Sequence, residues 1–117
     1  MTKNVNRGEI WWVNWSPGRG SEQQGLRPAV IVQTDAANLN PKYPNTIVVA
    51  ISTKGKSVPF HIEVKPSSIN GLNKKSFIKT EQILTISKER LINRIGMLEE
   101  KYLEQVEEAI KLVLDLN

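Results

Sequence analysis

Residues 20–28 read GSEQQGLRP, and residues 29–34 continue as AVIVQT. The second run is apolar and β-branched, so residues 27–34 are predicted to form a strand that is buried on both faces. Pro28 lacks a backbone N–H and is tolerated only in the first residues of such a strand or on a sheet edge. The sequence therefore places a charged, amide-rich loop directly before a core strand, with Arg27 and Pro28 at the junction.

The rest of the chain alternates short β-type runs with turn-rich connections. Strands are predicted at residues 9–15, 46–53, 60–64, 76–86 (one long or two short strands) and 91–98. Loops are predicted at residues 16–25 and 35–45, and a single helical turn at 87–90. In the second loop, Pro41 and Pro44 are expected to prevent regular structure. Because no helices alternate with the strands, we expect six or seven short strands in a mostly antiparallel, barrel-like sheet.

The last segment has a different pattern. Residues 99–116 carry apolar side chains at helical spacing, at Leu103, Val106, Ile110 and Val113, which predicts an amphipathic helix. No Ser, Thr, Asp or Asn stands directly before it, so its N-cap is expected to be weak. The predicted fold class is thus mainly β with a C-terminal helix (α+β), as a single domain over residues 1–117.

Composition excludes several classes of chemistry. The 117 residues contain no Cys and one His, so disulfides, thiolate metal sites and Cys nucleophiles are excluded, and a zinc site is not expected. We expect neither a metal nor a cofactor. No apolar run suits a signal peptide or a membrane span, so a cytoplasmic protein without membrane contact is expected.

The charge is unevenly distributed along the chain. Residues 1–98 hold 14 Lys and Arg against 6 Asp and Glu, whereas residues 99–117 hold 2 Lys against 6 Asp and Glu. A basic body favours a polyanionic partner, with nucleic acid first. Arg, Lys, Glu, Gln, Ser and Thr suffice to cleave RNA, because RNA carries its own nucleophile in the 2′-hydroxyl. Arg matches two phosphate oxygens with its planar fork, and a Ser or Thr hydroxyl donates to the same oxygens.

Several strings together resemble the MazF/PemK family of toxins. They are RGEIWWVNWSPGRGSEQQGLRPAVIV (residues 7–32), VVAIST (48–53), VPFHIEV (58–64), TEQILTISKERL (80–91) and IGML (95–98). The resemblance covers nearly the whole chain and implies a small SH3-like, CcdB-like barrel that forms a homodimer. It implies a metal-independent endoribonuclease that cuts single-stranded mRNA and leaves 2′,3′-cyclic phosphate and 5′-hydroxyl ends. The partner that it implies is a MazE-like antitoxin with a flexible acidic tail.

The resemblance also implies roles for individual residues. The catalytic Arg of the family matches Arg27, and its catalytic Thr matches Ser52, with Thr53 as the alternative if the strand register slips by one residue. The loop acid matches Glu22, which is the expected proton-transfer residue. Further residues are expected to contact RNA, mostly through charge or stacking: Arg7, Arg19, Gln23, Lys54, Lys56, Phe60, Lys79 and Gln82.

The tryptophans of residues 9–15 divide between the two faces of the predicted strand. Strict alternation predicts that Ile10 and Trp12 pack in the core. Trp11, Val13 and Trp15 would then share the opposite face, which we interpret as a surface for a second copy or an antitoxin.

Two other functions fit the same composition. A CcdB-like toxin would bind DNA gyrase without cleaving RNA, but the C-terminal segment lacks the terminal aromatic residue that such binding would use. An SH3-like module that binds peptides would require acidic loops, whereas the loops of this chain are basic.

Overall fold

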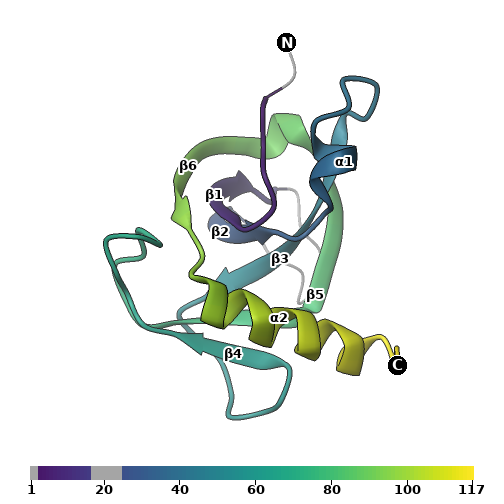
Figure 1. The fold of residues 1–117 in the computed structure, drawn as a ribbon. Coiled ribbons are helices and arrows are strands. Elements are labelled where there is room, and N and C mark those ends of the chain that lie inside the picture. Colours follow the sequence, from purple (N-terminus) through teal and green to yellow (C-terminus); the bar gives the residue numbers. More distant parts are fainter. Residues whose placement is uncertain (1–2, 17–24) are drawn as a thin grey trace.

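The computed structural model describes residues 3–16 and 25–117 of the chain. Six strands, two short helical turns and one long helix lie within these ranges (Figure 1). In chain order they are β1 (Glu9–Asn14), β2 (Leu26–Ile31), α1 (Asp35–Asn38), β3 (Asn45–Ser52), β4 (His61–Val64), β5 (Ser76–Ser87), the 3₁₀ turn η1 (Lys88–Arg90), β6 (Leu91–Met97) and α2 (Glu100–Val113). The mainly β fold with a C-terminal helix is confirmed.

The strands form one antiparallel sheet in the order β4-β5-β3-β2-β1-β6. The sheet coils strongly, as Figure 1 shows, but no pairing between β4 and β6 closes it among the described residues. Strand β5 has a large bulge, because Val49 pairs with Ile83 whereas the next residue, Ala50, pairs with Lys79. The bend at this bulge allows one long strand to serve both the main sheet and the β4 edge.

Both faces of the coiled sheet are covered by apolar side chains. One core contains Ile10, Val30, Val49 and Ile78 and is closed by the stripe of α2, with Leu103 and Val106. The second core contains Trp11, Val13 and Trp15, together with Val5, Ala29, Ile31, Val48, Ala50, Ile86 and Leu91. The prediction of an exposed apolar face on β1 is therefore wrong, because coiling turns that face inward.

Trp12 also departs from the prediction. It shares a strand face with Ile10, which is fully buried, yet the Trp12 side chain is 36% exposed. Trp11 and Trp15 are 8% and 7% exposed. Strand alternation correctly predicted which side chains of β1 share a face and that Ile10 is buried, but it gave the wrong environment for Trp12 and for the opposite face.

Helix α2 begins without a side-chain cap, as its sequence predicts. Residue Glu99 precedes it in extended conformation and uses its carboxylate elsewhere. The helix is instead held by its buried stripe and by an ion pair of 2.7 Å between Arg7 Nη2 and Glu107 Oε2. No helix within the described residues is long and apolar enough to cross a membrane.

The second predicted loop contains a short helix that the sequence did not indicate. Asp35–Asn38 form α1, and its four residues precede both prolines, which explains why Pro41 and Pro44 do not prevent it. The Asn38 amide donates to the Gln33 carbonyl, and its oxygen accepts from the Thr46 hydroxyl at 2.7 Å. The helical turn expected at residues 87–90 is present as η1, capped by the Ser87 hydroxyl, which accepts from Glu89 N–H.

The packing of the second core predicts that two leucines of the same sheet contribute differently to the free energy of unfolding. Leu91 is fully buried in it, whereas Leu84 is 42% exposed. We expect Leu91→Ala to lower the free energy of unfolding by about 2–5 kcal/mol, because it leaves a cavity. Leu84→Ala, the matched control, should cost less than about 1 kcal/mol. Urea unfolding measures both, and equal losses would contradict the described packing.

Candidate functional site

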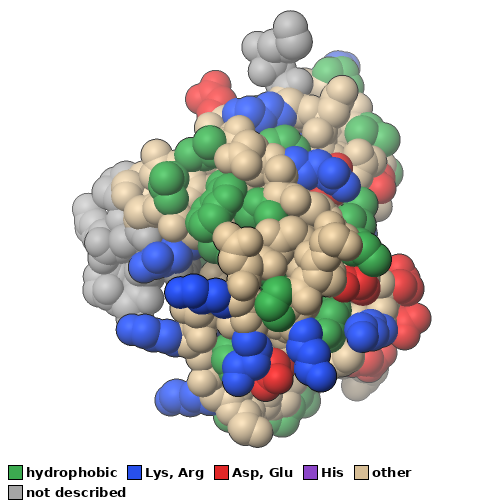
Figure 2. All heavy atoms as spheres, turned by 90° about the vertical axis from the view of Figure 1, so that its left-hand side faces the viewer, with side chains coloured by type: hydrophobic (Ala, Val, Ile, Leu, Met, Phe, Trp, Pro, Cys, Tyr) green, Lys and Arg blue, Asp and Glu red, His purple; other side chains and the backbone are tan. Residues whose placement is uncertain are grey.

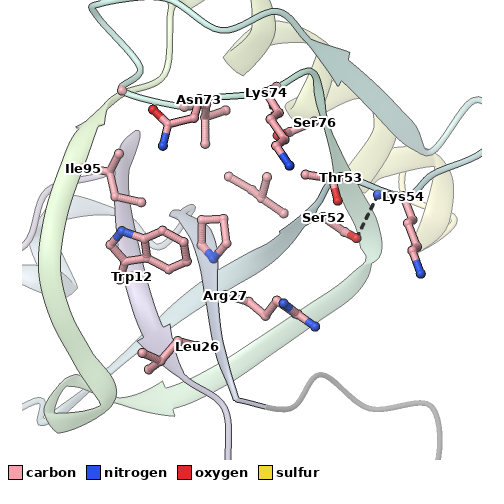
Figure 3. Close-up of a pocket in the computed structure, with 14 residues that line it drawn as sticks. Trp12, Leu26, Arg27, Ser52, Thr53, Lys54, Asn73, Lys74, Ser76 and Ile95 are labelled. Atoms are coloured by element: carbon pink, nitrogen blue, oxygen red, sulfur yellow. Dashed lines mark hydrogen bonds between the residues drawn. The ribbon is translucent and has the colours of Figure 1, made fainter.

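A cavity of about 530 Å³ opens where β2 and β3 separate (Figure 3). The two strands pair at Ala29–Ala50, Val30–Val49 and Ile31–Val48, and the ladder ends there. The next residue of β2 is Pro28, which has no N–H to continue a ladder. Leu26, Arg27 and Pro28 remain paired with β1 on their other side, so they form one wall of the opening.

The register of the ladder relates Arg27 to Ser52. In this antiparallel pair, one residue toward the start of β2 corresponds to one residue toward the end of β3. Two residues beyond the pair Ala29–Ala50, the register therefore relates Arg27 of β2 to Ser52 of β3. Both residues therefore lie on the strand face that carries Ala29 and Ala50. Arg27 is exposed and Ser52 is half-buried, and both line the cavity. Figure 3 shows the Arg27 side chain extending toward the side of the opening that holds Ser52.

The loop after β3 fixes the Ser52 hydroxyl. Ser52 Oγ accepts a hydrogen bond of 3.1 Å from the backbone N–H of Lys54, which leaves its own proton free to donate. Thr53 also lines the cavity, but it follows the end of the strand. The loop is pressed against β5, since a Cβ at Gly55 would lie 2.2 Å from Cγ of Phe77.

The third wall comes from the connection between β4 and β5. Its residues Gly71–Lys74 line the cavity, together with Ser76 at the start of β5. In Figure 3 the Lys74 amino group points into the opening, across from Arg27. Lys74 is not among the site residues that the sequence predicts. The available signal was the pair of lysines at positions 74 and 75, for which Glu81 is the only acidic residue within ten positions in the sequence.

The opposite half of the cavity is apolar. Trp12, Leu26, Pro28 and Ile95 line it, and Trp12 presents its indole at the left of the view in Figure 3. An aromatic ring beside small apolar side chains suits a flat aromatic group such as a nucleobase. The cavity thus joins an apolar half to a half that carries hydroxyl and cationic groups.

Charge distinguishes the cavity from the rest of the surface. Its lining includes Arg27, Lys54 and Lys74 and no Asp or Glu among the described residues. Figure 2 shows Lys and Arg side chains gathered beside a patch of hydrophobic ones, with most of the acidic side chains toward the right of that face.

The three cavity cations have no partner within the part of the chain that the structure describes. None of them makes a side-chain hydrogen bond or ion pair with another described residue, whereas several cations elsewhere in the chain are engaged. Arg7 pairs with Glu107, Arg94 pairs with Glu9, and Lys88 donates to the Asn38 carbonyl at 2.7 Å. Unpaired cations gathered in a cavity are typical of a site for an anion.

The remaining predicted site residues lie elsewhere. Lys56 lines a separate shallow pocket with His61 and Phe77, and the Phe60 ring meets the His61 ring edge-on at 5.4 Å. Lys79 and Gln82 lie on β5 and do not line the cavity. Their RNA contacts stay predictions, as do those of Arg19, Glu22 and Gln23, which lie outside the described residues. Within the described ranges, no group of three or more His, Cys, Asp or Glu residues gathers as a metal site.

A buried polar network supports the third wall from behind. Asn70 is fully buried, and its amide donates to the Lys65 carbonyl and to Glu99 Oε1, both at 3.0 Å. The Ser67 hydroxyl donates to Glu99 Oε2 at 2.8 Å. Partial burial raises the pKa of Glu99, but hydrogen bonds from Ser67, its own backbone and Asn70 outweigh this effect, so the pKa is lowered overall.

The sequence matches one described family and several curated relatives. The family of PemK-like, MazF-like toxins of type II toxin–antitoxin systems matches residues 6–114. A protein of Staphylococcus epidermidis named endoribonuclease MazF is 38% identical over 116 residues, covering 97% of this chain and 93% of its own. A protein of the same name from Staphylococcus saprophyticus is 39% identical over 117 residues, with the same coverage.

Solved structures resemble the fold at lower identity. MazF from Deinococcus radiodurans superposes with a TM-score of 0.81 at 19% identity, over 97% of this chain and 99% of that one. A mycobacterial endoribonuclease in complex with its cognate antitoxin superposes with a TM-score of 0.80 at 19% identity, over 97% of both chains. At this identity the likeness shows the shared fold.

The network behind the third wall predicts a pH effect. Because the pKa of folded Glu99 lies below its ordinary value of 4.5, ionised Glu99 stabilises the fold above that pH, and the contribution is lost as the pH falls through the folded pKa. We expect Glu99→Gln to be less stable than the parent at pH 7, with the difference shrinking below pH 4.5. Urea unfolding at several pH values measures it, with Glu100→Gln at the exposed neighbouring position as control. A difference that is constant with pH would contradict the role of the charge.

Proposed function

This chain belongs to the PemK-like, MazF-like toxin family of type II toxin–antitoxin systems and is an endoribonuclease, and we propose that it cleaves single-stranded RNA through Arg27 and Ser52. The observation that carries the proposal is the cavity itself. Arg27, Lys54 and Lys74, which have no partners among the described residues, line it together with Ser52, and no described acid lines it.

In the proposed reaction, the 2′-oxygen of a ribose attacks the adjacent phosphorus. A bond forms between the 2′-oxygen and phosphorus while the bond from phosphorus to the 5′-oxygen breaks. The 2′-hydroxyl loses its proton and the leaving 5′-oxygen gains one, so the products are a 2′,3′-cyclic phosphate and a 5′-hydroxyl. The nucleophile belongs to the substrate, and the protein has to position it and stabilise the negative charge that develops on the phosphate.

Arg27 is proposed to stabilise that charge. Its guanidinium is charged at every relevant pH and matches two phosphate oxygens at once. The backbone of Arg27 is held by β1 through its pairing with Val13, and its carbonyl accepts from Trp15 Nε1 at 3.3 Å. A guanidinium on a fixed strand loses less freedom when it binds phosphate than one on a loop.

Ser52 is proposed to donate the second hydrogen bond. The strand register supports Ser52 over Thr53, because it relates Ser52 to Arg27 on one strand face. Its hydroxyl accepts from Lys54 N–H, so its proton is available for a phosphate oxygen. Glu22 is proposed for proton transfer on the resemblance of its loop motif alone.

The biological partners follow from the family. As a toxin of a type II system, the protein acts on RNA and is paired with an antitoxin. We propose that the antitoxin is MazE-like and covers the basic cavity with an acidic segment, that the toxin is a homodimer and that it acts in the cytoplasm on mRNA. No metal is proposed to take part, so cleavage should persist in EDTA.

Replacement of Arg27 tests the proposed chemistry. We expect Arg27→Ala to lower kcat by at least about 10²–10³-fold, because it removes a charged donor from the transition state. The assay is cleavage of a single-stranded RNA in EDTA, with analysis of the product ends, and a DNA strand of the same sequence should stay intact.

Lys42→Ala is the matched control, since Lys42 is exposed in the connection between α1 and β3, away from the cavity lining. It should cleave as the parent does. If Arg27→Ala cleaves RNA as fast as the parent while circular dichroism shows that its fold is retained, the assignment of Arg27 is refuted.

Substitutions at Ser52 and Thr53 distinguish the two candidate hydroxyls. Ser52→Ala should lower kcat about tenfold, which corresponds to one hydrogen bond of about 1.4 kcal/mol, and Ser52→Thr should retain activity. Thr53→Val should lose less than Ser52→Ala in the same assay. The reverse order would assign the hydroxyl to Thr53.

A further inference from the structure

Lys74 has no role in the proposed bond-breaking step, yet its side chain lines the cavity in which that step is proposed to occur. It lines the wall across from Arg27, and Figure 3 shows its amino group directed into the opening. The side chain is exposed and makes no hydrogen bond or ion pair with another described residue. A surface lysine with these properties is ordinarily solvated, and what distinguishes Lys74 is how firmly its backbone is held.

The backbone around Lys74 is fixed on both sides. The buried Ser76 hydroxyl donates to the Lys74 carbonyl at 2.9 Å. On the other side, Asn70 Oδ1 accepts from the backbone N–H groups of Leu72 and Ser67, at 3.0 and 3.1 Å. The amide of Asn70 is in turn bound to Glu99, at the start of α2. This network joins positions 29 residues apart in the chain.

The connection is also packed closely against β6. Met97 N–H donates to the Ile69 carbonyl at 2.9 Å. A Cβ at Gly71 would lie 2.4 Å from the Ile95 carbonyl oxygen, and one at Gly96 would lie 2.5 Å from that of Ile69. Two glycines thus allow backbone contact between the connection and the strand, which limits its movement.

A neighbouring lysine shows that position, rather than charge alone, distinguishes Lys74. Lys75 directly follows it, but its Nζ lies 5.8 Å from the centroid of the Phe77 ring and it does not line the cavity. The side chains of Lys74 and Lys75 therefore point in different directions, and the hydrogen-bonded backbone directs the Lys74 side chain into the cavity.

We propose that Lys74 binds a second phosphate of the RNA, next to the one held by Arg27 and Ser52. This inference rests on the proposed function and extends it. A single strand carries one phosphate per nucleotide, so a strand seated at Arg27 brings neighbouring phosphates to the rim of the same cavity. The cavity, at about 530 Å³, is of a size suited to one small ligand or nucleotide, with the apolar wall of Trp12 and Ile95 available to its base. Lys74 is a binding and positioning residue in this scheme.

The test measures RNA binding as a function of salt. The probe is a 2′-O-methyl RNA oligonucleotide, which lacks the attacking hydroxyl, and binding is followed by fluorescence anisotropy. Lys74→Ala should reduce the slope of log K against log salt by about 0.7, the value for one phosphate contact on a single strand. Lys74→Arg should retain the parental slope, and Lys75→Ala, the matched control, should also retain it. A parental slope for Lys74→Ala would overturn the proposal.

Cleavage kinetics separate this inference from the proposed function. Lys74→Ala should raise KM severalfold and change kcat less, because the contact is made in the bound ground state as well as in the transition state. An unchanged KM would also overturn the proposal, even if Arg27→Ala abolishes cleavage. If Arg27→Ala cleaves as the parent does while Lys74→Ala still weakens binding, the catalytic assignment fails and the phosphate contact stands.

Discussion

The separation of β2 from β3 is the constraint on which the site depends. Their ladder holds from Ile31–Val48 to Ala29–Ala50 and ends where Pro28 offers no N–H. Because β1 still pairs with residues 26–28, the strand keeps its direction after it leaves β3. The consequence is a cavity bounded by two rigid strands, with a guanidinium on one and a hydroxyl on the other at matching positions of the register.

The same cavity depends on a wall that comes from a distant part of the chain. Hydrogen bonds from Asn70 and Ser67 to Glu99 tie the β4–β5 connection to the start of α2, and the weak cap of the helix is explained by this use of the carboxylate. The helix thus has two functions: its apolar stripe closes one core, and the residue before it holds the wall that carries Lys74. The hydrogen bonds from Ser67 and Asn70 to the Glu99 carboxylate also contribute to its lowered pKa.

Local pattern predicted most of the elements. The strands, the turn at residues 87–90 and the C-terminal helix were indicated by alternation, turn residues and helical spacing, and the structure confirms them with boundary shifts of a few residues. Alternation failed to predict the surroundings of β1, because it separates two faces without saying what covers each. Coiling of the sheet buries Trp11 and Trp15 in a second core and leaves Trp12 at the cavity. The four residues of α1 were missed because nearby prolines outweighed a short helical signal.

The family resemblance, the fold class and the residue types of the candidate site follow from patterns that are local in the chain, since Arg27, Ser52 and Thr53 all stand in short motifs. Which cations share a cavity depends on the packing of distant segments. Lys54 and Lys74 line it with Arg27, whereas Lys56 and Lys79 do not. The physical reason is that a lysine's direction is set by the backbone that carries it, and here that backbone is fixed by strand pairing and by hydrogen bonds between residues far apart in the chain.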